Sequence, residues 1–203
     1  MDLAFDITTP AFSLANARAC AVASKLAYTD VPSVLNADTN TQVWIQDCGN
    51  AVVIAFRGTQ EPADFVTDAK AWREALKGCS IHVGFNRAEM SVDDEIHAYL
   101  HNVPAKPVFL AGHSLGGGLA MVCAYRWSCV RNPLAGVYTF GQPRVGNATF
   151  ADFYNDHEGS NTFRFVNKED VVPRLPGVAI GYRHAGQEVF LPCKGGYVLN
   201  PSL

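Results

Sequence analysis

Apolar and polar residues follow two rhythms along this chain, one typical of helices and one typical of buried strands. Helical spacing of apolar and small residues predicts helices, the first capped by Ser13, over 13–28, 64–76, 87–101, 115–128 and 148–155. Continuous apolar or β-rich runs predict strands at 41–47, 51–56, 80–83, 107–111, 134–140, 162–166 and 188–191, with a hairpin turn at 48–50. Apolar strands that alternate with helices predict a three-layer α/β fold, with a mostly parallel central sheet and helices on both faces.

One junction between a predicted strand and a predicted helix carries candidate chemistry. Residues 108–124 read VFLAGHSLGGGLAMVCA, so Gly112, Ser114 and Gly116 form a G-x-S-x-G pattern. A sharp turn of this kind exposes a nucleophile and needs small neighbours on both sides. It also brings the N–H of Leu115 and the helix N-terminus next to the serine. We therefore predict that Ser114 is a nucleophile; an ordinary strand-to-helix turn is the alternative, and a phosphate loop lacks its Gly-Lys-Ser/Thr.

Further motifs agree with this interpretation in sequence order. They read AVVIAFRGT at 51–59, IHVGF at 81–85, GHSLGG at 112–117, FGQPRVGN at 140–147 and VNKEDVVPRLP at 166–176. From about residue 15 to residue 192, the chain resembles the class 3 lipases of the α/β-hydrolase fold. The resemblance implies a serine carboxylester hydrolase that cleaves acylglycerols or related lipid esters through an acyl-enzyme, with transient contact to a lipid–water interface.

A nucleophilic serine needs an acid, a base and oxyanion donors around it. Asp170 follows the predicted strand 162–166, and the resemblance gives this position the triad aspartate, with Glu169 as its rival. The resemblance also implies that Thr59 supplies the second oxyanion donor beside the Leu115 N–H. The alternative is that residues 57–59 only end a strand.

The base is the open question. His184 is the sole histidine that follows Asp170, so chain order makes it the internal candidate. The segment 181–188, however, resembles a family segment whose histidine is not catalytic. In relatives the base lies further along, before the final helix, whereas this chain ends at Leu203 and looks short at that end. A truncated chain is the favoured interpretation; takeover by His184 and a non-catalytic lipid-binding relative are the alternatives.

The segment 60–73 corresponds to the lid region of the family. Phe65, Val66 and Trp72 would cover an acyl pocket and swing away at a lipid surface. A fixed amphipathic helix packed on the sheet fits the same residues equally well.

Composition limits the number of domains, the binding partners and the cofactors that we expect. We expect one domain over residues 1–203, and a net charge of −3 with scattered basic residues argues against nucleic-acid binding. Six cysteines without a C-x-x-C pair predict no metal site and fit buried core residues, with disulfides as the alternative. No cofactor is expected.

No apolar run is long enough to span a membrane, and the N-terminus lacks a secretory pattern. The chain as written is thus expected to be cytoplasmic, or secreted if a signal was removed.

Overall fold

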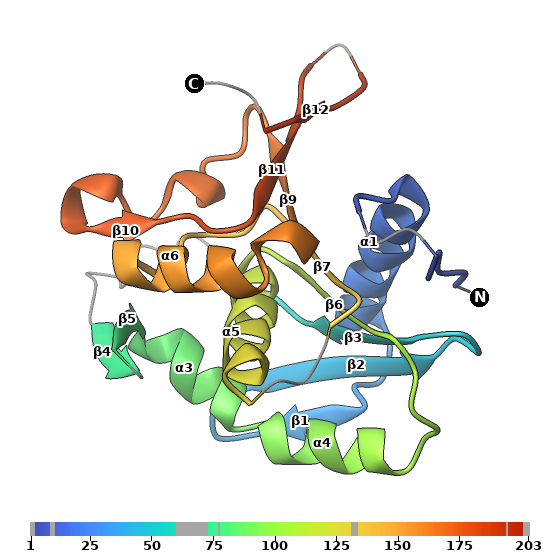
Figure 1. Ribbon diagram of the computed structural model, residues 1–203. Helices are drawn as coiled ribbons and strands as arrows, with labels where there is room; N and C mark the ends of the chain where they lie inside the picture. Colours follow the sequence, from blue (N-terminus) through green and yellow to red (C-terminus); the bar gives the residue numbers. More distant parts are fainter. Residues whose placement is uncertain are drawn as a thin grey trace.

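A twisted eight-stranded sheet crosses the middle of the molecule (Figure 1). It is seen in a computed structural model that describes residues 3–8, 11–59, 73–76, 78–130, 134–193 and 195–200. In spatial order the strands are β1 (Val34–Asn36), β2 (Thr41–Asp47), β3 (Val52–Phe56), β6 (Val108–His113), β7 (Gly136–Phe140), β9 (Thr162–Asn167), β11 (Gln187–Leu191) and β12 (Val198–Leu199). The five strands from β3 to β11 are parallel, and antiparallel strands flank them. The central sheet is mostly parallel, as predicted.

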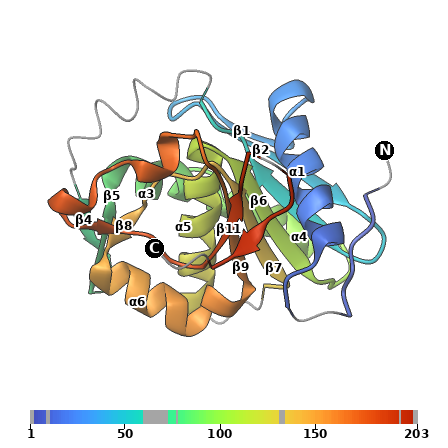
Figure 2. The same cartoon turned by 90° about the horizontal axis from the view of Figure 1, so that it is seen from above.

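Helices cover both faces of this sheet, as Figure 2 shows from above. Helix α1 (Leu14–Thr29) packs on one face, and its N-cap Ser13 accepts a hydrogen bond from the Asn16 N–H as predicted. The other face carries α5 (Leu115–Cys129), with α3 (Val83–Met90), α4 (Asp93–His101) and α6 (Ala148–His157) around it. Successive strand residues point to opposite faces, so a strand covered on both sides is apolar throughout. In β3, Val53 and Ala55 join the α1 core, while Val52, Ile54 and Phe56 join the α5 core.

A second, four-stranded sheet was not predicted. It contains β10 (Tyr182–Arg183), β8 (Gly146–Asn147), β5 (Cys79–His82) and β4 (Arg73–Leu76), in that order. The predicted helix 64–76 is therefore wrong at its end, because residues 73–76 pair with β5 in an antiparallel ladder. The rest of that helix, and the lid residues Phe65, Val66 and Trp72, lie outside the described residues.

The predicted helix 87–101 is also corrected, since two helices occupy this region. Helix α3 begins earlier, where His82 caps it by accepting a hydrogen bond from the Gly84 N–H at 3.0 Å. It ends where the Ser91 hydroxyl donates to the Ala88 carbonyl oxygen at 2.7 Å. A serine hydroxyl that bonds to a helix carbonyl in this way competes with the backbone hydrogen bonds of the helix. The next residue, Val92, is buried in the α5 core, and α4 starts after it.

The remaining connections are short. The predicted hairpin at 48–50 joins β2 and β3, with Gly49 at φ +84°. Three 3₁₀ turns, η1 (Gly159–Asn161), η2 (Val172–Arg174) and η3 (Val178–Ile180), occur around β9 and β10. All six cysteines are free, and Cys20, Cys79 and Cys123 are buried, as expected for core residues. Within the described ranges, no helix combines the length and apolarity that a bilayer span requires.

Candidate active site

Strand register brings four separate segments to one edge of the large sheet. Phe56 of β3 pairs with Gly112 of β6, and His113 of β6 pairs with Phe140 of β7. Phe140 in turn pairs with Phe165 of β9. The segments that follow these strands therefore leave the sheet together at its carboxyl edge, where open α/β sheets bind their ligands.

Ser114 occupies a strained turn at this edge. Its backbone has φ +55° and ψ −125°, a conformation that non-glycine residues rarely adopt. The Ser114 N–H donates to the Phe140 carbonyl oxygen at 2.8 Å, and the Gly117 N–H donates to the Ser114 carbonyl oxygen at 3.0 Å. Helix α5 begins at the next residue, Leu115. Strain of this kind persists only where neighbouring structure enforces it, and it clusters at active sites.

The glycines beside Ser114 are required by close backbone approach. A Cβ atom at Gly116 would lie 2.1 Å from the carbonyl oxygen of Phe56. A Cβ atom at Gly112 would lie 2.2 Å from the carbonyl oxygen of Gly116. Both contacts are with backbone, which cannot swing aside, so the strand-to-helix turn needs glycine at both positions.

The Ser114 hydroxyl is enclosed by the turn. The residue is 2% exposed, and its Oγ has no hydrogen-bond partner in the described part of the chain. A buried hydroxyl normally finds a partner, so an orphaned one at a strained turn fits a group that serves a reaction.

Asp170 lies in the loop after β9, at the same edge. Its Oδ1 accepts a hydrogen bond from the Val172 N–H at 2.9 Å. Its Oδ2 lies 2.6 Å from the position of a Cβ atom built on Gly141, and His113 Nε2 lies 3.8 Å from that same point. The Asp170 carboxylate and the His113 ring therefore both lie close to Gly141, and the Asp170 charge acts on His113. Glu169, the rival acid, contacts the thiol of the exposed Cys193 instead.

His184 is held in a different environment. Its Nε2 lies 2.6 Å from the Pro173 carbonyl oxygen, and its Nδ1 is buried without a hydrogen-bond partner in the described ranges. Burial lowers the pKa of His184 well below its usual value, and the positive charges of Arg164 and Arg144 lower it further. A neutral imidazole with its proton on Nε2 satisfies the Pro173 contact.

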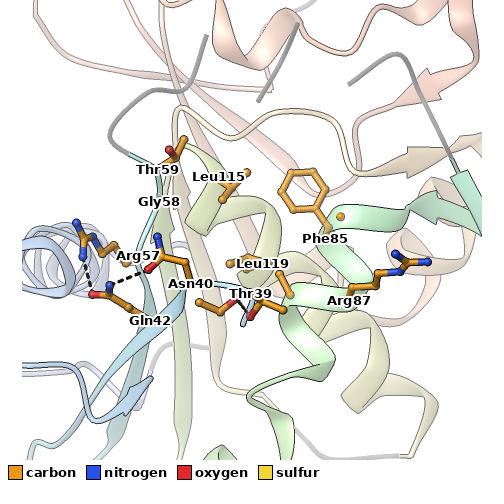
Figure 3. A pocket seen from close by; sticks show the side chains of 13 residues that line it. Thr39, Asn40, Gln42, Arg57, Gly58, Thr59, Phe85, Arg87, Leu115 and Leu119 are labelled. Carbon is orange, nitrogen blue, oxygen red and sulfur yellow. Dashed lines mark hydrogen bonds between the residues drawn. The ribbon is translucent and has the colours of Figure 1, made fainter. Parts of the chain in front are cut away.

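A cavity of about 640 Å³ opens beside the serine turn (Figure 3). Thr59 and Leu115, the two predicted oxyanion residues, lie at one end of it, and Phe85 faces them from the opposite wall. The lining residues are Thr39, Asn40, Thr41, Gln42, Arg57, Gly58, Thr59, Gly84, Phe85, Arg87, Ala88, Leu115 and Leu119. The structure thus brings Thr59 and Leu115 to one cavity. The sequence patterns did not reveal the residues of its opposite wall.

Two residues near the turn were not predicted to belong to the site. The Tyr28 hydroxyl lies 3.1 Å from His113 Nδ1, and the two rings meet edge to face. Both residues line a groove of about 510 Å³ on the α1 side of the turn, together with Phe140. Tyr28 sits on the apolar stripe of the first helix, which indicates only a core position. Its hydroxyl is the signal that points to a further role.

One group of side chains in the described ranges has the spacing of metal ligands. Atoms of Glu89, Asp93 and Cys123 lie within 4.8 Å of one another between α3, α4 and α5. Burial and the nearby Asp93 charge raise the pKa of Glu89 to about 8. Arg126 Nε lies 2.9 Å from a Glu89 carboxyl oxygen, so a side-chain cation already sits next to this group.

Comparison with known proteins agrees with this geometry. The family model for class 3 lipases matches residues 53–180. A lipase from Rhizomucor miehei is 34% identical over 170 residues, which is 78% of this chain and 47% of that protein. The secreted mono- and diacylglycerol lipase 1 of Fusarium solani is 32% identical, over 79% of this chain and 50% of that protein.

Solved structures show the same likeness. The lipase of Rhizopus microsporus var. chinensis superimposes with a TM-score of 0.75 at 26% identity, covering 89% of this chain and 76% of that one. A triacylglycerol lipase described as having a serine protease triad superimposes with a TM-score of 0.67 at 31% identity, covering 75% of this chain and 62% of that one. The fold and the serine turn are those of the α/β-hydrolase class. Within that class, the chain belongs to the class 3 lipase family.

The chain spans about half the length of the curated relatives it matches. Two of these relatives, from Fusarium solani and Penicillium cyclopium, are named as secreted proteins. The expectation of a cytoplasmic protein finds no support in these comparisons.

Proposed function

We propose that this protein hydrolyses lipid esters through an acyl-enzyme at Ser114. The Ser114 oxygen attacks the ester carbonyl, and the Leu115 N–H and Thr59 stabilise the negative charge on the former carbonyl oxygen. Collapse of this intermediate releases the alcohol, and water then releases the fatty acid from the serine. The observation that carries the proposal is the strained Ser114 backbone at the sheet edge, next to a cavity that Thr59 and Leu115 share.

The substrate class follows from the cavity and from the relatives. A volume of about 640 Å³ is within the range of small-molecule pockets, and Phe85, Leu115 and Leu119 give it apolar walls. Relatives of similar sequence are named as lipases and as mono- and diacylglycerol lipases. We therefore propose acylglycerols as substrates, met at a lipid–water interface, and secretion as for the named relatives.

Asp170 is proposed as the acid that orients the base. Two sources of the base fit this scheme. His184 is the internal candidate by chain order, but its Nε2 contact with the Pro173 carbonyl would have to break first. A histidine outside residues 1–203 is the other source. Either would accept the Ser114 proton and pass it to the leaving alcohol.

Hydrolysis of p-nitrophenyl butyrate by the purified chain, with and without added imidazole, tests the proposal. Turnover without imidazole that Ser114→Ala abolishes supports it and indicates that the base lies within the chain. Turnover that appears only with imidazole, and again not in Ser114→Ala, supports it and indicates an external base. Equal hydrolysis by the chain and by Ser114→Ala under both conditions contradicts it.

A second candidate function is lipid-ester binding without turnover. It is favoured by one observation, that no base among the described residues accepts a hydrogen bond from the Ser114 hydroxyl. Saturable binding of a non-hydrolysable ether analogue, together with no Ser114-dependent hydrolysis with or without imidazole, would select this function over the first.

A further inference from the structure

Tyr28, in the last turn of helix α1, reaches the candidate site. Tyr28 is partly buried, and its hydroxyl lies 3.1 Å from His113 Nδ1. Sequence separates the two residues by 85 positions, so this contact joins the helix on one face of the sheet to the turn that holds Ser114.

The same hydroxyl also contacts the segment that carries Thr59. A hydrogen bond from the Gly58 backbone N–H lowers the pKa of Tyr28, although burial raises it more. A Cβ atom at Gly58 would lie 2.2 Å from the Tyr28 hydroxyl and 2.5 Å from the His113 carbonyl oxygen. The peptide before Thr59 is therefore pressed between Tyr28 and the serine turn. Arg57 lies over the Tyr28 ring, 5.8 Å from its centroid.

One arrangement of protons satisfies both contacts of the Tyr28 hydroxyl. Its oxygen accepts the Gly58 N–H, and its own proton is donated to His113 Nδ1. In that arrangement the neutral imidazole carries its proton on Nε2, which lies 3.8 Å from the same Gly141 Cβ position that Asp170 Oδ2 approaches. Partial burial lowers the pKa of His113, and the Asp170 charge opposes this shift. Among the described residues, Asp170 and Arg57 are the charged groups that act on Tyr28 and His113, and Lys25 lies on the groove wall.

We propose that Tyr28 and His113 form a positioning pair that sets residues 57–59 and the Asp170 carboxylate in place relative to Ser114. This proposal rests on the proposed function, in which Thr59 and Asp170 serve the Ser114 reaction. Neither Tyr28 nor His113 touches the reacting atoms in this scheme. Their effect passes through the Gly58 peptide on one side and through the charge interaction between His113 and Asp170 on the other.

Tyr28→Phe is the sharpest variant, because it removes one oxygen and keeps the ring under Arg57. We expect kcat for p-nitrophenyl butyrate to fall roughly tenfold to a hundredfold, with KM nearly unchanged, since small misplacements of catalytic groups are costly. The matched control is Tyr154→Phe, because the Tyr154 hydroxyl is buried and lies 2.8 Å from Thr162 Oγ1. That control should lose stability but keep kcat. The assay includes imidazole if the parent chain requires it.

A second measurement follows the His113 ring by nitrogen-15 NMR and does not depend on turnover. In Tyr28→Phe the pKa of His113 should rise by roughly half to one pH unit, since the neutral ring loses a donor to Nδ1. In Asp170→Asn the pKa of His113 should fall, because an opposing charge is gone. Tyr154→Phe should leave it unchanged.

The two readouts separate the proposals. An inactive parent chain whose His113 pKa responds as predicted contradicts the proposed function and supports the contacts of the pair. An active parent whose Tyr28→Phe variant keeps kcat overturns the positioning pair, and so does a His113 pKa that ignores both substitutions.

Discussion

The serine turn and the segment between β10 and β11 each hold a histidine, and the two histidines are held differently. His113 lines a groove, contacts Tyr28 and lies near the Asp170 charge. His184 is tied to the Pro173 carbonyl and lies near Arg164, a side chain only 4% exposed. Partial or full burial lowers the pKa of both.

This difference shows that order along the chain and position in space carry separate information. Chain order selects His184 because it follows Asp170. The fold instead brings Asp170 next to the histidine that directly precedes the nucleophile. A short strand, β10, and its partner β8 keep His184 with the second sheet, and this sheet left no clear pattern in the sequence.

The largest effect is expected at Asp170, and the neighbouring Glu169 in the loop after β9 is its control. Asp170→Asn should lower the turnover number roughly 10⁴-fold, as loss of a triad acid does in serine hydrolases. Glu169→Gln should change it little, because Glu169 points toward Cys193. Rates for p-nitrophenyl butyrate, corrected by a Ser114→Ala blank, measure both. Equal losses in the two variants would remove Asp170 from its proposed role.

The next effect concerns the oxyanion end of the cavity. Thr59→Val should cost about 3 kcal/mol of transition-state stabilisation, close to a hundredfold in turnover number. Thr149→Val, an exposed position on α6, is the control and should keep the parent rate. A Thr59→Val enzyme with an unchanged turnover number would show that residues 57–59 only end a strand.

A third comparison sets a glycine of the turn against a glycine of the loop. Gly116→Ala forces its Cβ against the Phe56 carbonyl, whereas a Cβ at Gly177 meets nothing within 4 Å. We expect Gly116→Ala to lower the free energy of unfolding by at least about 1–3 kcal/mol. Gly177→Ala should stay within about 0.5 kcal/mol of the parent. Urea unfolding followed by fluorescence measures both free energies. Similar midpoints for the two variants would contradict the close approach of the Gly116 and Phe56 backbones.

The smallest effect is a pH dependence at His184. A histidine whose folded pKa is lowered binds a proton in the unfolded chain before it does so in the folded one. The free energy of unfolding therefore falls as pH drops below the unfolded pKa, by at most about 1.4 kcal/mol per pH unit. Glu89, whose pKa is raised to about 8, acts in the opposite direction. Only the difference between parent and variant isolates His184.

His184→Asn should remove this contribution between pH 6.5 and 5, while the exposed His101→Asn should not. Urea titrations at a series of pH values measure the slopes. Parallel slopes for the parent and His184→Asn would show that His184 is not buried as a neutral ring.

Sequence patterns predicted the large sheet and the serine turn because both depend on strong local signals. A strand buried on both faces must be apolar along its whole length, as Val52–Phe56 is, and glycines must flank a serine at a tight turn. Strands of two to four residues, such as β8 and β10, are too short for a period to show. They form because partners distant in sequence meet them.

The far wall of the cavity and the Tyr28 contact could not be predicted for the same reason. Thr39 and Asn40 lie in a turn before β2, and nothing local indicates that they face Phe85. Tyr28 fits its helix as an apolar residue, and only the packing of α1 across β6 reveals what its hydroxyl meets.

The central claim is that the turn presents Ser114 as an activated nucleophile. Fluorophosphonate labelling tests it most directly, with the modified peptide located by mass spectrometry and imidazole added in a parallel sample. The account predicts a single adduct on Ser114, formed far faster than on free serine, and absent after Asp170→Asn over the same time. Labelling that is as slow as for free serine in both samples, or that falls on another residue, would contradict it.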